Sequence, residues 1–375
     1  MSVSDTAITR RGALTMGAGV VIGGLGLSRA AQAAPEGKPV KLTTAQLAGQ
    51  RVIFSYPGAT PPASLLDLIA AGLVGGVIFF GENITSLSQI AGVVTQLKEA
   101  HAASPVSSPL LLMTDQEGGI VRRLPGEPVL SEKEIGASAD PVAEASAAGT
   151  GAGQNLAGVG MNTNLAPVLD VFRQAGNFDD EFGRSYSMDQ NVCAECGAAM
   201  ITAQQKLNIA ATAKHFPGLG AATVDQNTDL GPVTLDVPLA DLRSIDEVPF
   251  RTAIAAGVRM VMTSWAMYPA LDPKLPSGLS PTIVGGELRG RLKFRGVTIT
   301  DALEAGAIAS FGTPAQCGVL AAQAGMDVLL CSARDVSEGQ DTVAAIADAL
   351  QHHALNPGQF EIALRRVLAL RNSLA

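Results

Sequence analysis

The sequence contains few cysteines and histidines, four of each among 375 residues. Cys193 and Cys196 lie three positions apart on a predicted helix, Asp189–Leu207, but neither a second C-x-x-C pair nor a nearby histidine pair completes a metal site. We therefore interpret them as buried helix thiols and leave the pairing of the four cysteines open. A phosphate-binding loop and a dinucleotide fingerprint are also missing. The sequence predicts no metal, nucleotide or flavin cofactor.

Clusters of basic residues and long apolar runs are missing beyond the first 33 residues. The formal net charge is −8, and that first segment contains three arginines and one aspartate, so its removal leaves −8 − 2 = −10. An acidic surface without basic clusters argues against nucleic acid or an anionic membrane as a partner. Aromatic residues make up only 4% of the chain and apolar residues 47%, which predicts a sizeable aliphatic core.

The first 33 residues are a predicted export signal. Thr9-Arg10-Arg11 precedes the uncharged, glycine-rich run Ala13–Leu27, and Ala31-Gln32-Ala33 follows it. Paired arginines, a short apolar core and an A-x-A exit indicate a twin-arginine signal peptide. A membrane anchor is the alternative, but the run is too short and too rich in glycine to span well. We expect a secreted, periplasmic or cell-wall-associated protein of 375 − 33 = 342 residues, with no membrane association after signal removal.

Residues 34–375 alternate short aliphatic runs with longer amphipathic stretches. The eight predicted strands are Arg51–Phe54, Gly76–Phe80, Leu110–Thr114, Asn162–Leu165, Ile209–Ala213, Arg259–Thr263, Val297–Thr300 and Asp327–Leu330. The predicted helices include Ala63–Ala71, Leu87–Ala102, Pro141–Gly158, Asp241–Ala256, Ile283–Leu292, Thr313–Ala324 and a closing helix, Pro357–Leu374. Eight strands with helices between them predict a single-domain α/β fold, a (β/α)₈ TIM-type barrel. A doubly wound open sheet is the alternative, disfavoured because no glycine-rich phosphate fingerprint follows the first strand.

Polar side chains follow several of the predicted strands at the point where each strand ends. Asp115 follows the third strand, Lys214 and His215 follow the fifth, Ser264 the sixth and Asp301 the seventh. The carboxyl ends of barrel strands meet on one face, which is where barrel enzymes place their catalytic groups. We therefore expect these residues to converge on one site.

The stretch K-H-F-P-G-L-G-A-A-T-V-D-Q-N-T-D begins with two donor side chains, Lys214 and His215. Glycines then turn the chain sharply and leave room for a ligand to approach. The loop that follows contains the carboxylates Asp225 and Asp229. This pattern indicates a site for a polyhydroxylated substrate with proton transfer nearby.

Further residues complete the predicted site. Asp115, before a Gly-Gly pair, would accept hydrogen bonds from hydroxyl groups, and one of the arginines Arg122 and Arg123 would return to the pocket as a donor. Asp170 either pairs with a pocket cation or caps its loop, and Arg184 is either a surface residue or a forked donor to a sugar oxygen. Asp301, directly after an aliphatic strand, is placed as a glycosidase nucleophile needs to be.

Five motifs, in this order, resemble those of glycoside hydrolase family 3, and its single-barrel β-N-acetylhexosaminidase branch most closely: T-D-Q-E-G-G-x-V-x-R, N-x-A-P-V-L-D-V, G-R-S-Y-S, K-H-F-P-G-L-G and T-D-A-L. The resemblance implies a retaining exo-β-glycosidase that forms a covalent glycosyl-enzyme on Asp301. The substrate would be a carbohydrate with a terminal N-acetylated or related sugar, of cell-wall or chitin type, and we expect a monomer. The residues that would hold the terminal sugar are Asp115, Arg123, Arg184, Lys214 and His215.

Three positions depart from this family pattern. Ile120 and Leu219 replace an arginine and a histidine, and Asn227 stands where the branch has the histidine of a D-x-H motif that acts as general acid/base. Asparagine cannot deliver a proton at neutral pH, and losing general-acid assistance forfeits about 10²–10⁴ in rate.

Three explanations compete for the missing histidine. In the first, Asp225 or Asp229 serves as the acid after burial raises its pKa. In the second, the substrates have good leaving groups, or the sugar is transferred to an acceptor other than water. In the third, the protein is a catalytically impaired or inactive carbohydrate-binding homologue. We favour a loop aspartate. A weaker hypothesis is a different barrel hydrolase whose acid is Glu304, one helical turn beyond Asp301, although a glutamate at that position more readily caps or solvates the following helix.

Overall fold

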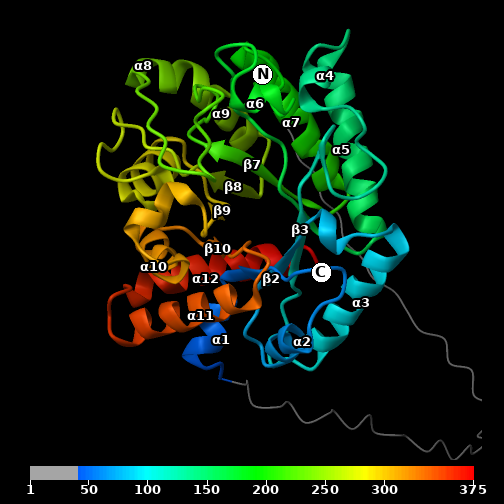
Figure 1. Cartoon of the computed structure of the whole chain (residues 1–375), viewed down its shortest axis with the longest axis vertical. Helices are drawn as coiled ribbons and strands as arrows, with labels where there is room; N and C mark the ends of the chain where they lie inside the picture. Colours follow the sequence, from blue (N-terminus) through cyan, green and yellow to red (C-terminus); the bar gives the residue numbers. More distant parts are fainter. Residues whose placement is uncertain (1–40) are drawn as a thin grey trace, which may run out of the picture. The chain divides into compact units, whose positions relative to one another are not determined.

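Eight parallel strands close into a barrel in the computed structural model, which describes residues 41–375 (Figure 1). The predicted signal peptide lies outside the described residues. The strands are β1 (Val52–Phe54), β2 (Gly76–Phe79), β3 (Leu111–Thr114), β6 (Thr163–Asn164), β7 (Ala210–Phe216), β8 (Met260–Thr263), β9 (Val297–Ala302) and β10 (Val328–Leu330). Their order around the barrel follows the chain, and β1 pairs with β10 to close it. The predicted (β/α)₈ barrel is confirmed.

Helices surround the barrel and connect its strands. The α-helices are α1 (Thr44–Gly49), α2 (Ala63–Ala70), α3 (Leu87–Ala102), α4 (Glu132–Gly136), α5 (Pro141–Gly158), α6 (Phe178–Glu181), α7 (Gln190–Lys206), α8 (Leu239–Asp241), α9 (Glu247–Ala255), α10 (Pro314–Ala324), α11 (Val336–Gln351) and α12 (Pro357–Asn372). The 3₁₀-helices are η1 (Gly81–Asn83), η3 (Ser277–Leu279) and η5 (Gly306–Phe311), and the π-helices are η2 (Leu242–Asp246) and η4 (Thr282–Arg291). None of these helices is long and apolar enough to cross a membrane.

The helix predictions hold for α3 and α5 to the residue, and three points differ. The predicted helix over residues 241–256 is divided between η2 and α9, and the one over residues 283–292 is the π-helix η4. Helix α11 was not among the predicted elements. An antiparallel hairpin of β4 (Gln116–Gly118) and β5 (Val121–Arg122) follows β3, and Gly118 adopts φ 125° there. A left-handed backbone of this kind is strained for any residue with a side chain, which explains the glycine.

Two strands extend further than predicted, and this matters for the site. Strand β7 continues to Phe216 and β9 to Ala302. Lys214, His215 and Asp301 therefore lie on the last residues of strands rather than after them. The backbone of Lys214 pairs with that of Val168, which holds it more firmly than a loop would.

The interior of the barrel is filled by aliphatic side chains from alternate strand positions. They include Ile53, Leu111, Met260 and Ile299, all fully buried. Val367 and Leu370 of α12 belong to the same cluster, so this helix closes one end of the barrel.

Cysteines 193, 196, 317 and 331 are all free and buried. Burial raises the pKa of the Cys193 thiol well above its usual range, which keeps it protonated and unreactive. The interpretation of Cys193 and Cys196 as buried helix thiols on α7 is confirmed.

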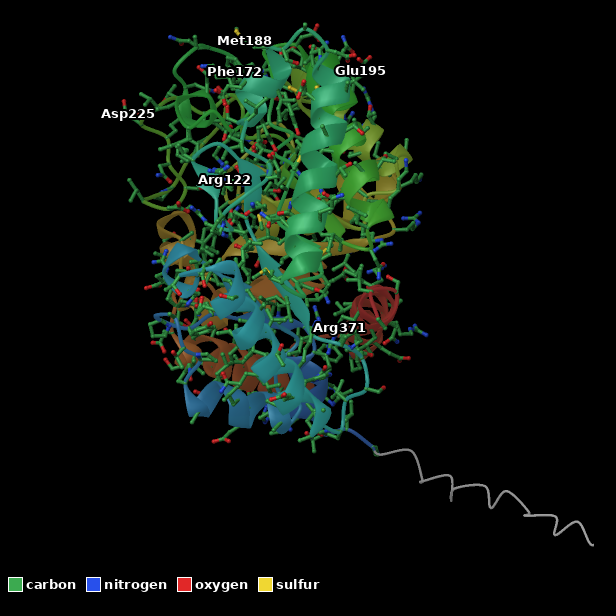
Figure 2. The ribbon with its side chains drawn as sticks, turned by 90° about the vertical axis from the view of Figure 1, so that its right-hand side faces the viewer. Arg122, Phe172, Met188, Glu195, Asp225 and Arg371 are labelled. Atoms are coloured by element: carbon green, nitrogen blue, oxygen red, sulfur yellow. The ribbon has the colours of Figure 1, made fainter. Side chains whose placement is uncertain are left out.

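Arg371 of α12 is fully buried and anchors that helix to the barrel (Figure 2). Its guanidinium donates to the carbonyls of Ser108 and Pro109, at 2.7 and 2.6 Å, and to Gln50 Oε1 at 2.7 Å. These three bonds join the last helix to Gln50, which follows α1, and to the segment that leads into β3.

We expect Arg371→Met to lower the free energy of unfolding by about 3 kcal/mol, because it leaves three buried acceptors without a donor. Urea denaturation would measure the change. Arg365→Met is the matched control: this arginine lies on the exposed face of the same helix, and its loss should change stability by no more than about 0.5 kcal/mol. Equal effects of the two substitutions would contradict the anchoring role.

Candidate active site

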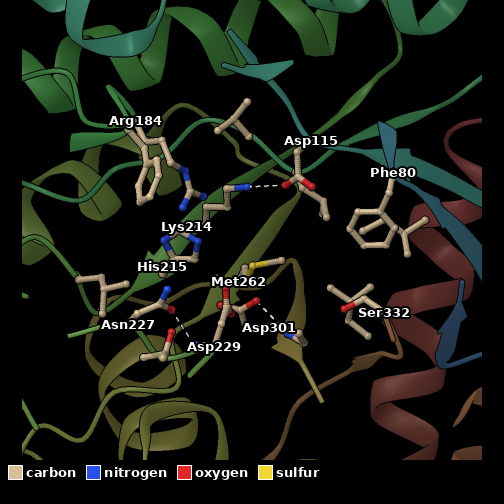
Figure 3. Close-up of a pocket in the computed structure, with 18 of the residues that line it drawn as sticks. Phe80, Asp115, Arg184, Lys214, His215, Asn227, Asp229, Met262, Asp301 and Ser332 are labelled. Atoms are coloured by element: carbon tan, nitrogen blue, oxygen red, sulfur yellow. Dashed lines mark hydrogen bonds and ion pairs between the residues drawn. The ribbon is translucent and has the colours of Figure 1, made fainter. Parts of the chain in front are cut away.

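A cavity of about 730 Å³ opens at the carboxyl ends of the barrel strands (Figure 3). Its wall contains side chains from β2, β5, β7, β8, β9 and β10 and from loops at the same end of the barrel, among them Asp115 after β3. Seven of the eight residues predicted for the site line it: Asp115, Arg123, Arg184, Lys214, His215, Asp229 and Asp301.

A buried ion network forms one wall of the cavity. Lys214 Nζ lies 2.7 Å from Asp115 Oδ1 and 2.7 Å from Glu117 Oε1. Arg184 donates to both oxygens of Glu117, from Nε at 2.9 Å and from Nη2 at 3.0 Å. Arg184 is therefore not a surface residue, and its forked donor group is paired with Glu117; a hydrogen bond from Arg184 to a sugar oxygen stays a prediction.

The pKa shifts in this network agree with charged groups. Burial alone would raise the pKa of Glu117, but the charges of Arg184 and Lys214 outweigh it and lower the pKa to about 2. Burial would lower the pKa of Lys214, but Asp115 and Glu117 raise it overall. Glu117 is therefore a carboxylate and Lys214 an ammonium at neutral pH. Asp115 remains partly open to the cavity, where its carboxylate can still accept hydrogen bonds.

His215 and the fully buried Asp170 form a second pair. His215 Nδ1 lies 2.7 Å from Asp170 Oδ2, and Asp170 Oδ1 accepts from the backbone amides of His215 and Leu219 at 3.2 and 2.6 Å. Asp170 thus both pairs with a pocket side chain, His215, and caps the loop. Burial would lower the pKa of His215, but the charge and hydrogen bond of Asp170 raise it overall.

Asp301 stands at the end of β9, on the opposite side of the cavity from Asp115 (Figure 3). One of its oxygens, Oδ1, accepts the backbone amide of Ala302 at 2.8 Å, which fixes the orientation of the carboxyl group. Asp301 is neither buried nor fully exposed. Its other oxygen can therefore meet a ligand.

The loop after β7 brings Asn227, Thr228 and Asp229 to the cavity. Asn227 Oδ1 accepts the amide of Asp229 at 2.8 Å, so the asparagine shapes the turn that places this aspartate. Asp229 is exposed at the mouth of the cavity, which it lines. Partial burial, and then the negative charge of Asp301, raise the pKa of its carboxyl group. A raised pKa is what a general acid needs.

The same loop is seated on the segment that follows β9. The amides of Gly306 and Ala307 donate to the carbonyls of Asp229 and Thr228, at 2.9 and 3.0 Å. A Cβ atom on Gly306 would lie 2.5 Å from the carbonyl oxygen of Leu230. Only glycine allows the loop to approach this closely.

Two predicted candidates for the acid lie differently from Asp229. Asp225 is exposed at the edge of the molecule and does not line the cavity (Figure 2). Glu304 lines the cavity but accepts from the hydroxyl group of Ser332 at 2.7 Å. Among the residues that line the cavity, His215 is the only histidine.

The sequence analysis missed two buried carboxyl groups beside the site. Glu117 was quoted within its motif but given no role, although it stands two positions after Asp115 in the hairpin and shares Lys214 with it. Asp179, in α6, is fully buried, and neither of its carboxyl oxygens has a hydrogen-bond partner among the described residues. Burial, and then the charge of Asp170, raise its pKa to about 7. No sequence signal distinguishes Asp179 from its neighbours Asp180 and Glu181.

The described residues contain no group of three or more histidine, cysteine or acidic side chains that could hold a metal ion. The cavity instead combines fixed cations, Lys214 and Arg184, with carboxyl groups in different environments. Such an arrangement can bind a hydroxylated ligand and separate a nucleophilic carboxylate from a proton-donating one.

Comparisons with known proteins agree with this arrangement. The sequence model of the glycosyl hydrolase family 3 N-terminal domain matches residues 41–370. The chain is 46% identical over 348 residues to a protein of Arthroderma benhamiae named an uncharacterized secreted glycosyl hydrolase, covering 92% of this chain and 97% of that one. It is 30% identical to beta-hexosaminidase A of Pseudoalteromonas piscicida, covering 89% of this chain and 62% of that one.

Solved structures of glycoside hydrolases also superpose well on this chain. A family 3 beta-N-acetylglucosaminidase from Paenibacillus sp. superposes with a TM-score of 0.84 and 33% identity, over 89% of this chain and 63% of that one. A beta-N-acetylhexosaminidase from Beutenbergia cavernae gives 0.80 and 35%, over 88% and 99%. The chain therefore spans about three fifths of some relatives and nearly the whole length of others.

We expect Gly306→Ala to unseat the loop, because the added methyl group would overlap the carbonyls of Asp229 and Leu230. Hydrogen exchange at positions 306 and 307 should speed up by about fivefold or more, the value of one lost hydrogen bond. Gly285→Ala is the control, since a Cβ there meets nothing within 4 Å. Unchanged exchange at 306 and 307 would show that the loop is held elsewhere.

Proposed function

The chain belongs to glycosyl hydrolase family 3, and from this premise we propose that it is an exo-acting, retaining β-N-acetylhexosaminidase. The relatives named as hexosaminidases support the N-acetylated sugar, because no contact in the cavity identifies that group by itself. The predicted signal over residues 1–33 and a relative named as secreted support export.

One observation supports the reaction most strongly: Asp301 faces a cavity whose other side holds fixed hydrogen-bonding groups. A hexopyranose ring has hydroxyl groups on one side and its anomeric carbon on the other. Asp115, Arg123 and the network around Lys214 would bind the hydroxyl groups. The anomeric carbon would then lie toward Asp301, where a nucleophile needs to be.

In the first step, a carboxylate oxygen of Asp301 attacks the anomeric carbon, and the bond from that carbon to the leaving oxygen breaks. Asp229 donates its proton to the leaving oxygen. Its raised pKa keeps the carboxyl group protonated to a higher pH than an ordinary aspartic acid. The products of this step are a glycosyl ester on Asp301 and the free alcohol.

In the second step, the ionised Asp229 removes a proton from a water molecule, whose oxygen attacks the anomeric carbon. The ester bond to Asp301 breaks and returns its carboxylate. Two inversions at the same carbon leave the configuration of the sugar unchanged, as in other retaining glycosidases. His215, whose pKa the charge of Asp170 raises, would stabilise the negative charge on Asp301 between turnovers when its ring is protonated.

Turnover of two substrates side by side tests the proposal: nitrophenyl β-N-acetylglucosaminide, whose leaving group barely needs a proton, and chitobiose, whose leaving group does. Cleavage of both would support an enzyme with an acid in place of the family histidine. Cleavage of the aryl sugar alone would support the nucleophile without the acid. Binding without cleavage of either would instead indicate a carbohydrate-binding homologue.

We expect Asp301→Asn to reduce turnover of the nitrophenyl sugar by about four orders of magnitude or more, because the amide cannot form the glycosyl ester. Circular dichroism should show an intact fold. An active Asp301→Asn variant would place the nucleophile elsewhere.

Asp229→Asn should reduce turnover of chitobiose by about 10²–10⁴, with a much smaller effect on the nitrophenyl sugar. The acid must be protonated before reaction, so the wild-type rate on chitobiose should fall as the pH rises through the raised pKa of Asp229. The variant should lose this descending limb of the pH profile.

Asp225→Asn is the matched control, since this aspartate lies in the same loop but outside the cavity lining. Its chitobiose rate and pH profile should match those of the wild type. If Asp229→Asn behaves like Asp225→Asn, the proton comes from another group.

A further inference from the structure

Four apolar side chains remain in solvent at the cavity mouth or on the segments beside it. Ile120 is 69% exposed, Val129 54%, and Leu130 and Phe182 40% each. We call these four residues the apolar ledge. Large exposed apolar side chains scattered singly are ordinary, but a contiguous group beside a cavity marks a place where an apolar ligand binds.

Backbone contacts hold together the three segments that carry these side chains. The amide of Gly119 donates to the carbonyl of Val129 at 3.2 Å, and Gly118 approaches the carbonyl of Leu130 closely. The amide of Lys133 donates to the carbonyl of Gly183 at 3.2 Å, which brings the segment after residue 130 beside Phe182.

The ledge is also continuous with the cavity, because Ile120 and Phe182 line it. Phe182 packs edge-on against Phe178, with ring centroids 5.7 Å apart, and Phe178 lines the cavity too. The aromatic pair fixes the Phe182 ring at the mouth.

The chemistry of the ledge differs sharply from that of the inner cavity. Lys214, Arg184 and Asp115 offer charges and hydrogen bonds to a sugar, whereas the side chains of the ledge neither donate nor accept. A second sugar placed there would lose hydrogen bonds to water without replacing them. An alkyl or aryl group would gain free energy by leaving water.

We propose that the apolar ledge binds an apolar leaving group, so that the substrate is a glycoside of an alkyl or aryl alcohol. The inference rests on the proposed function, because it places the terminal sugar in the inner cavity. An aryl alcohol also departs with little help from an acid, which suits a cavity where an aspartate replaces the family histidine.

Affinity for a series of S-linked glycosides tests the ledge without depending on turnover. Methyl, propyl and hexyl 1-thio-β-N-acetylglucosaminides share the sugar and resist hydrolysis, so only the length of the chain changes. A chain covered on one side only should gain about half the value of a buried methylene, so calorimetric titration should give a Kd that falls about twofold for each added methylene, or roughly thirtyfold from methyl to hexyl. A flat series would overturn the inference.

Substitutions in the ledge locate the contact. In Ile120→Ser and Phe182→Ser, the ratio of the methyl to the hexyl Kd should drop to a few-fold at most. Met188→Ser is the control, because Met188 is exposed but lies outside the cavity lining, and it should keep the full ratio. A ratio that survives both ledge substitutions would place the alkyl chain elsewhere and overturn the inference.

The outcome separates this inference from the proposed function. Hydrolysis of nitrophenyl β-N-acetylglucosaminide with a flat thioglycoside series would support the proposed function and reject the role of the ledge. A graded thioglycoside series without hydrolysis of any glycoside would reject the proposed function and support binding of the alkyl chain to the ledge.

Discussion

The arrangement of the cavity depends on one buried ammonium group, that of Lys214. Only 2% of the residue is exposed, and an isolated cation would lose far more hydration there than the fold could recover. Two carboxylates from the β3–β4 segment, Asp115 and Glu117, remove this penalty. Glu117 in turn needs more than one cation beside it, which draws in Arg184. Satisfying one buried charge thus ties β7, the β4–β5 hairpin and the loop after α6 into one rigid wall.

Much of the fold and part of the site could be predicted from the sequence, because both follow from patterns along the chain. Alternation of aliphatic runs and amphipathic stretches predicts the barrel. The barrel then requires Asp115, Lys214, His215 and Asp301 to meet, since the ends of parallel strands share a face. Family resemblance adds Arg123 and Arg184, which lie on loops.

The rest could not be predicted, because it depends on contacts between segments distant in the sequence. The pairing of Glu117 with Lys214 and the burial of Asp179 appear only when separate loops meet. The contact between Asp229 and Gly306 is a hydrogen bond between backbone groups. Such a bond cannot be read from the types of the two residues. The ledge is similar: Ile120 and Phe182 are 62 positions apart, and nothing between them indicates that they form one surface.

The closure of the barrel has a consequence for the way the protein is made. The seam pairs Val52 of β1 with Leu329 of β10, and the end of the barrel is filled by α12 near the carboxyl terminus. The ribosome synthesises the chain from its amino terminus, so the edge of β1 that pairs with β10 stays unpaired until nearly all later strands have emerged. Contacts so distant in sequence form slowly. The nascent chain therefore passes through a long open stage in which strand edges are exposed, and it is at that stage that chaperones would matter most for this protein.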